Sequence, residues 1–279
     1  MPSKPKLGQN FLRDHNAIRR IADALGDIAE QTVVEIGPGQ GAITRILAER
    51  ARHLIAIELD RELAPALRTQ FPPDRVTVIE QDVLSFDFSA AASSAGQKLA
   101  VVGNLPYYIT SPILLKLAAS CAALDRAVLM VQREVADRIT AGPGSRDYGL
   151  LSVTVQMYGP VASLFTLPPG AFSPPPEVHS SVFRWRFAPR FAELGVEEQP
   201  FLRFVRHSFA QKRKTIANNL RGAQYDSEAI HAALEAAQLP AQARAEELSI
   251  PELAALHIRL DRHPQSEGPA PQNEASPSV

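Results

Sequence analysis

The chain has 279 residues, of which 45% are hydrophobic and 21% charged, a composition that excludes a fibrous repeat and a chain disordered throughout. Its 29 Lys and Arg residues balance 30 Asp and Glu residues, which excludes a surface basic all over but not a local basic patch. The single cysteine, Cys121, excludes internal disulfides and fits a reducing compartment, and the scattered histidines predict no metal site. No apolar run is long enough to span a membrane and the N-terminus is polar, so a soluble cytoplasmic protein is expected.

Short apolar runs alternate with helical stretches over the first two thirds of the chain. After a helix around Ile18–Leu25, strands are expected at Val33–Gly37, His53–Glu58, Val76–Ile79, Leu99–Gly103 and Ala127–Val131, with helices at Ile43–Arg50, Glu62–Phe71 and Ile113–Ala119. Leu151–Tyr158 and Ser180–Phe187 are rich in β-branched and aromatic residues and are expected to form an antiparallel strand pair. The pattern predicts an α/β fold with a seven-stranded, mostly parallel sheet that binds its ligand at the carboxyl ends of the strands.

The last third of the chain has a different character. Five prolines in Pro168–Pro176 predict a stiff loop. Phe201–Leu220 and Ser227–Leu260 are expected to be helical, with a break near Gln211–Lys214, and the polar stretch at 263–279 is expected to be disordered. The predicted organisation is therefore a first domain over 1–188, a small all-helical domain over 189–262 and a disordered tail over 263–279.

Three strand ends carry residues suited to a nucleoside. Gly37-Pro-Gly-Gln-Gly41 follows the first strand, and such a loop at the start of a helix lets a ligand approach the backbone closely. Pro38 removes one N–H donor, which argues against a pyrophosphate ligand. Glu58, 21 positions after Gly37, can accept both ribose hydroxyls, and Asp82 can accept from an adenine amine. A plain tight turn and solvated carboxylates are the alternative interpretations.

The fourth strand ends in Gly103-Asn-Leu-Pro-Tyr-Tyr108, the most specific feature of the chain. Asn104-Leu-Pro-Tyr107 resembles the Asn/Asp-Pro-Pro-Tyr tetrapeptide of methyltransferases that act on exocyclic amines of bases. Together with it, the chain contains in order Gly8-Gln-Asn-Phe-Leu12, Gly37-Pro-Gly-Gln-Gly41, Glu58-Leu-Asp60, Gln81-Asp82, Gln132-Arg-Glu-Val135, Tyr148-Gly-Leu-Leu-Ser152, Phe172-Ser-Pro-Pro-Pro-Glu-Val178 and Gln211-Lys-Arg-Lys-Thr215. This series is similar to the small-subunit ribosomal RNA adenine dimethyltransferases.

The resemblance implies a Rossmann-like class I methyltransferase fold, S-adenosylmethionine as cofactor, and 16S rRNA within the small ribosomal subunit or its precursor as substrate. The reaction implied is dimethylation of the N6 amines of two adjacent adenosines in the 3′-terminal hairpin. It also implies that Asn10 and Leu12 contact the cofactor as part of a flap, and that Phe172 lies at the target-base pocket. Without the family, these would be an N-terminal arm and a core phenylalanine.

The chemistry of an adenine amine explains the tetrapeptide. The amine is a poor nucleophile because its lone pair is delocalised into the ring, and two acceptors holding its protons favour a pyramidal nitrogen. The side-chain oxygen of Asn104 and the carbonyl of Leu105 are predicted to be these acceptors, and the ring of Tyr107 to stack on the base. Asn104 is also expected to border the cofactor, whereas Tyr108 receives no role. A capped loop before a helix is the alternative.

A basic segment without any acid lies in the predicted helical domain at Phe201–Tyr225, whereas Asp226–Val279 is rich in acids. The segment is expected to contact RNA phosphates through Arg203, Arg206, Lys212, Arg213, Lys214 and Arg221. The alternative is a solvated basic face.

Three other functions would each explain part of the sequence. A dinucleotide oxidoreductase explains the glycine loop and Glu58 but not Asn104–Tyr107. A 23S rRNA adenine dimethyltransferase of the macrolide-resistance type shares the tetrapeptide, but such proteins are typically strongly basic and this chain is not. A role in ribosome assembly or transcription without catalysis is disfavoured by the intact set of cofactor residues. Nothing in the sequence requires more than a monomer.

Overall fold

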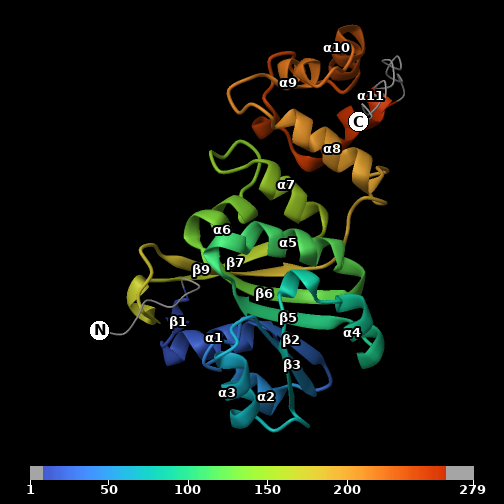
Figure 1. Ribbon diagram of the computed structural model, residues 1–279. Helices are drawn as coiled ribbons and strands as arrows, with labels where there is room; N and C mark the ends of the chain where they lie inside the picture. Colours follow the sequence, from blue (N-terminus) through green and yellow to red (C-terminus); the bar gives the residue numbers. More distant parts are fainter. Residues whose placement is uncertain (1–8, 262–279) are drawn as a thin grey trace, which may run out of the picture. The chain divides into compact units, whose positions relative to one another are not determined.

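The computed structural model describes residues 9–261, which form two compact units (Figure 1). The first comprises residues 9–141 and 151–190, and the second residues 142–150 and 191–261. The division at 190/191 lies close to the expected domain boundary. The segment 142–150, expected in the first domain, belongs to the second unit. The disordered tail expected at 263–279 lies outside the described residues.

A seven-stranded sheet of order β4-β3-β2-β5-β6-β9-β7 forms the first unit (Figure 1). Its strands are β2 (Thr32–Ile36), β3 (His53–Glu58), β4 (Val76–Glu80), β5 (Leu99–Asn104), β6 (Leu124–Gln132), β7 (Val161–Leu167) and β9 (Ser180–Arg186). The first five of these pair in parallel, and β9 runs antiparallel to both β6 and β7. All five residues of β2 are buried, as expected for a central parallel strand covered on both faces. The predicted seven-stranded, mostly parallel α/β fold is confirmed.

Helices cover both faces of this sheet (Figure 1). One face carries α1 (His15–Ala24), α2 (Thr44–Arg50) and α3 (Leu63–Gln70), and the other α4 (Phe88–Ala95), α5 (Thr110–Ala119), α6 (Arg133–Thr140) and α7 (Leu150–Met157). Buried side chains of α1 and α2, such as Ile18, Ile21 and Leu47, form the core with the sheet. Among the described residues, no helix is long and apolar enough to cross a membrane.

The strand predicted at Leu151–Tyr158 is wrong, because these residues form helix α7. The strand that pairs with β9 is instead β7. Helix α7 satisfies the free carbonyls at the end of α6: the Gln156 side-chain amide donates to Ile139 O and Ala141 O, both at 2.9 Å, and the Ser152 hydroxyl donates to Arg138 O. This tertiary contact outweighs the strand preference of the β-branched residues.

A second sheet of two strands joins the N-terminal arm to the proline-rich loop. Strand β1 (Phe11–Leu12) runs antiparallel to β8 (Phe172–Ser173), with Leu12 opposite Phe172. The amide of Arg13 donates to Ala171 O at 2.8 Å and extends this pairing. The arm is therefore anchored to a loop that five prolines make stiff.

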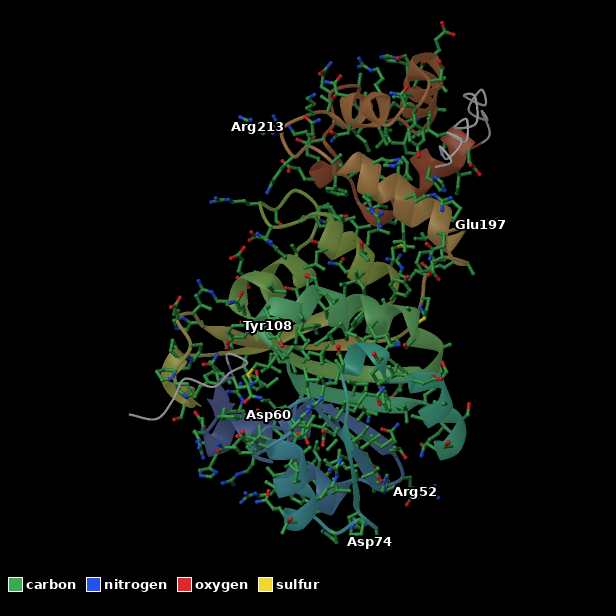
Figure 2. All side chains as sticks on the ribbon, viewed as in Figure 1. Arg52, Asp60, Asp74, Tyr108, Glu197 and Arg213 are labelled. Atoms are coloured by element: carbon green, nitrogen blue, oxygen red, sulfur yellow. The ribbon has the colours of Figure 1, made fainter. Side chains whose placement is uncertain are left out.

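The second unit is helical, with α8 (Glu198–Ser208), α9 (Ile216–Gly222), α10 (Ser227–Ala236) and α11 (Ile250–Asp261). Helix α8 ends at Ser208 and α9 begins at Ile216, which confirms the break predicted near Gln211–Lys214. Arg213 lies in the turn between the two helices (Figure 2). Segment 142–150 is held to this unit by a hydrogen bond from Gly144 N to Glu246 O at 2.8 Å and by the Tyr148 ring against that of Phe209.

Candidate active site

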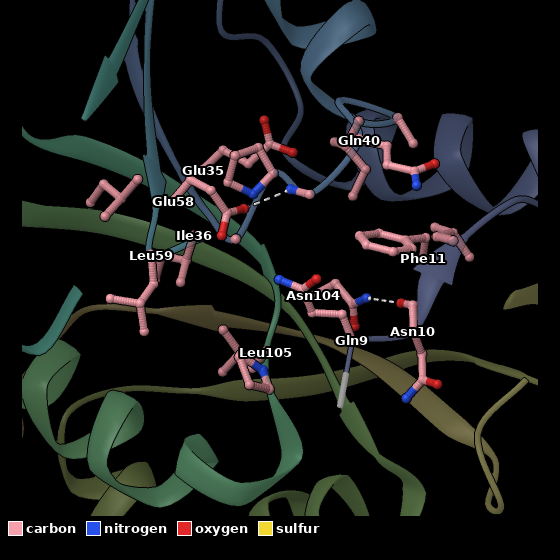
Figure 3. Close-up of a pocket in the computed structure, with 18 of the residues that line it drawn as sticks. Gln9, Asn10, Phe11, Glu35, Ile36, Gln40, Glu58, Leu59, Asn104 and Leu105 are labelled. Carbon is pink, nitrogen blue, oxygen red and sulfur yellow. Dashed lines mark hydrogen bonds between the residues drawn. The ribbon is translucent and has the colours of Figure 1, made fainter. Parts of the chain in front are cut away.

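A cavity of about 450 Å³ lies at the carboxyl ends of the central strands (Figure 3). It is centred where the strand order reverses, because β2 pairs with β3 on one side and with β5 on the other. Ligands of open α/β sheets bind at such a point. Of the residues predicted from the sequence, eight line this cavity: Asn10, Leu12, Gly37, Glu58, Asp82, Asn104, Leu105 and Tyr107.

Pairing of β2 with β5 brings the two most informative motifs together. Ile36 stands opposite Gly103, so the glycine loop and the Asn-Leu-Pro-Tyr turn leave the sheet side by side. A Cβ built on Gly37 would lie 3.7 Å from the carbonyl oxygen of Asn104. Segments 67 positions apart in the chain therefore form one wall of the cavity.

The N-terminal arm lies against both motifs (Figure 3). The side-chain amide of Asn104 donates to Asn10 O at 3.0 Å, and Arg13 donates to Gln40 Oε1 at 2.7 Å. Gly39 has φ +59°, and a Cβ there would lie 3.0 Å from the Phe11 ring, so the close approach of the arm requires glycine. Sequence reasoning missed the contacts of Phe11 and Gln40, because nothing local indicates which loop an arm will cover.

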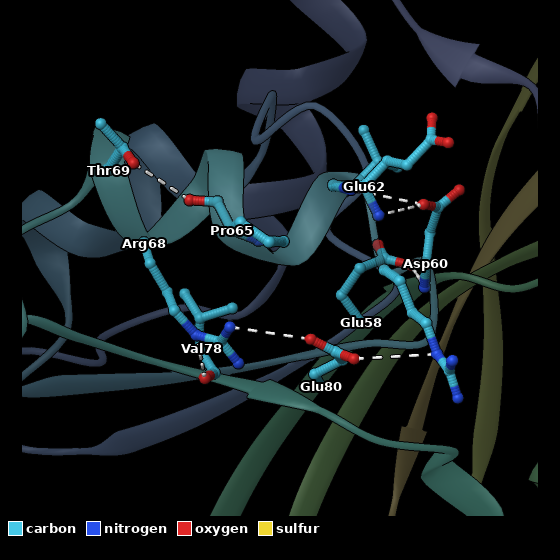
Figure 4. A network of polar contacts seen from close by, with 10 residues as sticks. Glu58, Asp60, Glu62, Pro65, Arg68, Thr69, Val78 and Glu80 are labelled. Carbon is cyan, nitrogen blue, oxygen red and sulfur yellow. Dashed lines mark hydrogen bonds and ion pairs between the residues drawn. The ribbon is translucent and has the colours of Figure 1, made fainter.

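Glu58, the last residue of β3, is buried, with 4% of its surface exposed. One carboxylate oxygen accepts from Gly39 N at 3.0 Å and the other from Asp60 N at 2.9 Å (Figures 3 and 4). Burial raises the pKa of Glu58, and the hydrogen bonds from Asp60 and Gly39 oppose that rise. Each oxygen keeps a lone pair for a further donor. Asp82 uses one oxygen to accept from Leu84 N at 2.9 Å.

Glu35 is a cavity residue that the sequence analysis did not assign to the site. It lies within β2, is buried, and accepts from the Thr44 hydroxyl at 2.7 Å. Burial, with a smaller contribution from the charge of Glu58, raises the pKa of Glu35 to about 7. A single acid inside an otherwise apolar strand was the signal that could have identified it.

Wild type is expected to lose stability as the pH rises, and Glu35→Gln is expected to escape this loss because Gln does not ionise. In the unfolded chain the carboxyl ionises near pH 4.5, but in the folded protein only near pH 7, so the wild-type stability present below pH 4.5 is lost as the pH rises to about 7. Between pH 5 and 8 the free energy of unfolding of wild type should fall by about 2–3 kcal/mol relative to Glu35→Gln. Urea denaturation at both pH values measures this difference, with the exposed Glu49→Gln of α2 as control. Parallel curves for wild type and Glu35→Gln would contradict it.

The Asn-Leu-Pro-Tyr turn is held in one conformation by contacts on both sides. Leu105 N donates to Met130 O at 2.9 Å, and the Leu105 side chain is buried. The Tyr107 hydroxyl forms a 2.7 Å hydrogen bond with the Ser180 hydroxyl, and burial raises the pKa of Tyr107. The side-chain nitrogen of Asn104 donates to Asn10 O, so the side-chain oxygen of Asn104 is left to accept a hydrogen bond from another group.

Phe172 does not meet the expectation that it forms part of the base pocket. Only 4% of the residue's surface is exposed, and it belongs to the core with Leu12 and Ile18. It is not among the described residues that line the cavity. The physical reason is its strand pairing with Leu12, because both residues belong to the same buried core cluster. Phe172 is therefore left out of the catalytic set proposed below.

All six cations predicted to bind RNA are exposed in the second unit. Arg203 and Arg206 lie on α8, Arg221 lies on α9, and the other three occupy the turn between these helices. The Lys212 ammonium donates to Arg146 O at 2.7 Å, a contact with segment 142–150 that no local pattern predicts.

Residues 209–215, between α8 and α9, form the basic turn. It is stabilised by Asn219, which is buried in α9. Its amide nitrogen donates to Ser208 O at 2.7 Å and to Gln211 O at 3.1 Å, and its oxygen accepts from Gln211 N at 3.2 Å. Lys212, Arg213 and Lys214 are thus presented to solvent from an ordered backbone.

Residues 2–261 match the model of the family described as "Ribosomal RNA adenine dimethylase". The chain belongs to this family. The "Ribosomal RNA small subunit methyltransferase A" of Acidobacterium capsulatum is 63% identical over 259 residues, which cover 92% of this chain and 91% of that protein.

Two solved structures are similar in fold. The 23S rRNA methyltransferase ErmE has a TM-score of 0.70 and 28% identity, covering 90% of this chain and 100% of its own. A dimethyladenosine transferase from Plasmodium falciparum has a TM-score of 0.79 and 21% identity, covering 90% of this chain and 98% of its own. These structures confirm the predicted class I methyltransferase fold of this rRNA adenine dimethylase. The family match and the curated relative confirm the predicted family, the enzyme class and S-adenosylmethionine as cofactor.

The cavity fits that cofactor in size and in its polar groups. Its volume is within the range of small-molecule pockets. The buried carboxylate of Glu58 and the free oxygen of Asp82 supply acceptors for a nucleoside, and Gly37 allows close approach to the backbone. Glu35 adds a buried acid on the same wall.

Glu58→Ala is expected to weaken S-adenosylmethionine binding about 10- to 150-fold, because charge-assisted hydrogen bonds to the nucleoside are lost. Asp82→Ala should act in the same direction. Isothermal titration of the folded variants measures the affinity.

A matched control is Glu80→Ala. Glu80 stands opposite Glu58 in the β3–β4 register, but its carboxylate faces Arg68 and Arg61 at 3.7 and 4.0 Å (Figure 4). It should bind the cofactor like wild type. Equal affinity of Glu58→Ala and Glu80→Ala would show that Glu58 does not contact the cofactor.

Proposed function

We propose that this enzyme transfers methyl groups from S-adenosylmethionine to the N6 amines of two adjacent adenosines in the 3′-terminal hairpin of 16S rRNA. The products are N6,N6-dimethyladenosines, formed during assembly of the small ribosomal subunit. The observation that carries the proposal is the convergence of Gly37, Glu58, Asp82 and the Asn104 turn on one cavity. The 63% identical relative, named as a small-subunit methyltransferase, supports the choice of RNA.

The proposed mechanism depends on positioning. The cofactor supplies an electrophilic methyl group. Glu58 and Asp82 hold its nucleoside, and the arm residues Asn10 and Leu12 cover the cavity beside the glycine loop. This leaves the Asn-Leu-Pro-Tyr turn to orient the target amine.

At that turn, the Asn104 side-chain oxygen and the Leu105 carbonyl accept one amine proton each, and the Tyr107 ring stacks on the adenine. The hydrogen bond from Asn104 to Asn10 fixes the orientation of the side-chain amide, so its oxygen needs little reorganisation during the reaction. The two acceptors favour a nitrogen with a directed lone pair. Once the methyl group is bound, the nitrogen is positively charged and acidic, so it loses a proton to water and no strong base is required.

The 23S rRNA is the alternative substrate, and one comparison bears on it. The sequence identity to ErmE is 28%, against 63% for the small-subunit methyltransferase.

The proposal places the enzyme in the cytoplasm, where small subunits assemble, and requires only one copy of the chain. The exposed cations of the second unit are proposed to contact RNA phosphates.

Methyl transfer from labelled cofactor to unmodified ribosomal subunits tests this proposal. We expect label in small subunits that lack the modification, recovered as N6,N6-dimethyladenosine after digestion to nucleosides. Large subunits and fully modified small subunits serve as controls. Labelling of 23S rRNA in place of 16S rRNA would overturn the choice of substrate, and labelling of neither would overturn the proposed activity.

A further inference from the structure

Tyr108 is an aromatic residue at the cavity that the proposed function leaves without a role. It follows Tyr107 in the 3₁₀ turn η2 (Tyr107–Ile109), lines the cavity, and is 62% exposed (Figure 2). The two tyrosines differ in environment. The Tyr107 hydroxyl is bonded to Ser180, whereas within the described part of the chain the Tyr108 side chain has no hydrogen-bond partner.

Exposed large apolar side chains are few among the described residues, and two of them lie at this cavity. Leu59 (45% exposed) follows Glu58 at the end of β3, and Tyr108 follows the Asn-Leu-Pro-Tyr turn at the end of β5. The two side chains therefore come from different strand ends. Leu59 therefore lies beside the proposed nucleoside acceptor and Tyr108 beside the proposed amine acceptors. An exposed aromatic ring at a polar site is typical of a surface that binds a partner.

The backbone under Tyr108 is ordered before any ligand arrives. Ile109 N and the Thr110 hydroxyl both donate to Pro106 O, at 3.2 and 3.1 Å, and α5 begins immediately after the turn. Little backbone entropy remains to be lost when a flat group packs on the ring. Splayed RNA bases commonly stack on aromatic side chains in this way.

We propose that the Tyr108 ring is a stacking site for the RNA base adjacent to the adenine held at Asn104. This inference rests on the proposed function, in which the substrate contains two adjacent adenosines. When one base occupies the methyl-transfer site at Tyr107, its neighbour is the flat group nearest to the next residue of the turn. The ring thereby holds the second adenosine and sets which of the two enters the site.

The proposal predicts a specific pattern among variants. Tyr108→Ala should weaken binding of the 3′-terminal hairpin within the small subunit about 5- to 150-fold, the range found for loss of one base–aromatic stack. Tyr108→Phe should restore binding, because the ring is kept, whereas Tyr108→Leu should not. Affinity for S-adenosylmethionine should remain that of wild type in all three. Leu115→Ala, which removes an exposed apolar side chain on α5 away from the cavity, is the control.

A local probe reports the contact directly. With 2-aminopurine in place of the adenosine next to the methylated one, wild type and Tyr108→Phe should quench its fluorescence on binding, and Tyr108→Ala should not. If wild type fails to methylate small subunits, the proposed function fails. If wild type methylates them but Tyr108→Ala binds and quenches like wild type, only the stacking site is overturned. A loss of cofactor affinity in Tyr108→Ala would also overturn it, by assigning the ring to the cofactor.

Discussion

Asn104→Ala is expected to lower the rate of methyl transfer about 10²- to 10³-fold, the usual cost of removing one well-placed polar group from a preorganised site. The Asn104 side chain is held by its hydrogen bond to Asn10 O, which leaves its oxygen to accept an amine proton. The loss should appear in turnover more than in RNA affinity, because this contact strengthens as the nitrogen pyramidalises. Single-turnover methylation at saturating cofactor and small subunit measures it.

Asn104→Asp is the informative companion variant. It keeps an acceptor oxygen but cannot donate to Asn10 O, so its rate should lie between those of wild type and Asn104→Ala. Cofactor affinity and thermal unfolding check that neither substitution has disturbed the fold. Methylation by Asn104→Ala within a few-fold of wild type would show that the proposed role of the turn is wrong.

The second large effect concerns the basic turn. The affinity for RNA falls as salt rises, and replacing Lys212, Arg213 and Lys214 by Ala should make this dependence less steep. The magnitude of the slope of log affinity against log salt should decrease by about 1.4–2.7, corresponding to two or three lost phosphate contacts. At 0.1 M salt the affinity should fall about 25- to 500-fold, because fewer counterions are released on binding. The range starts at two contacts because the Lys212 ammonium is already bonded to Arg146 O.

Salt titrations of RNA binding measure this slope, and cofactor affinity should remain that of wild type. The charge-matched control replaces Arg52, Lys98 and Arg184, three exposed cations of the first unit. Arg52 and Arg213 are labelled in Figure 2. A slope unchanged by the triple substitution would make the turn a solvated surface without a role in binding.

The sequence alone determined the fold class and most of the cavity. Parallel strands buried on both faces are mostly apolar, so the runs Val33–Gly37, apart from Glu35, and Leu99–Gly103 identify strands from composition. Four strands are also followed or ended by a residue that lines the cavity, at a position that can be recognised in the chain itself. Gly37, Glu58, Asp82 and Asn104 could therefore be predicted one by one, and the strand order then brought them to one edge of the sheet.

Tertiary structure decided the features that depend on contacts between distant segments. Helix α7 replaced a predicted strand because its side chains satisfy the end of α6. Phe172 entered the core because β8 pairs with the N-terminal arm. Segment 142–150 joined the helical unit through hydrogen bonds to residues far along the chain, such as Glu246. Asn219 holds the basic turn through hydrogen bonds to Ser208 and Gln211, which lie close to it in sequence. A local pattern reports which residues are apolar or polar, whereas the partner that each one meets is set by packing of the whole chain.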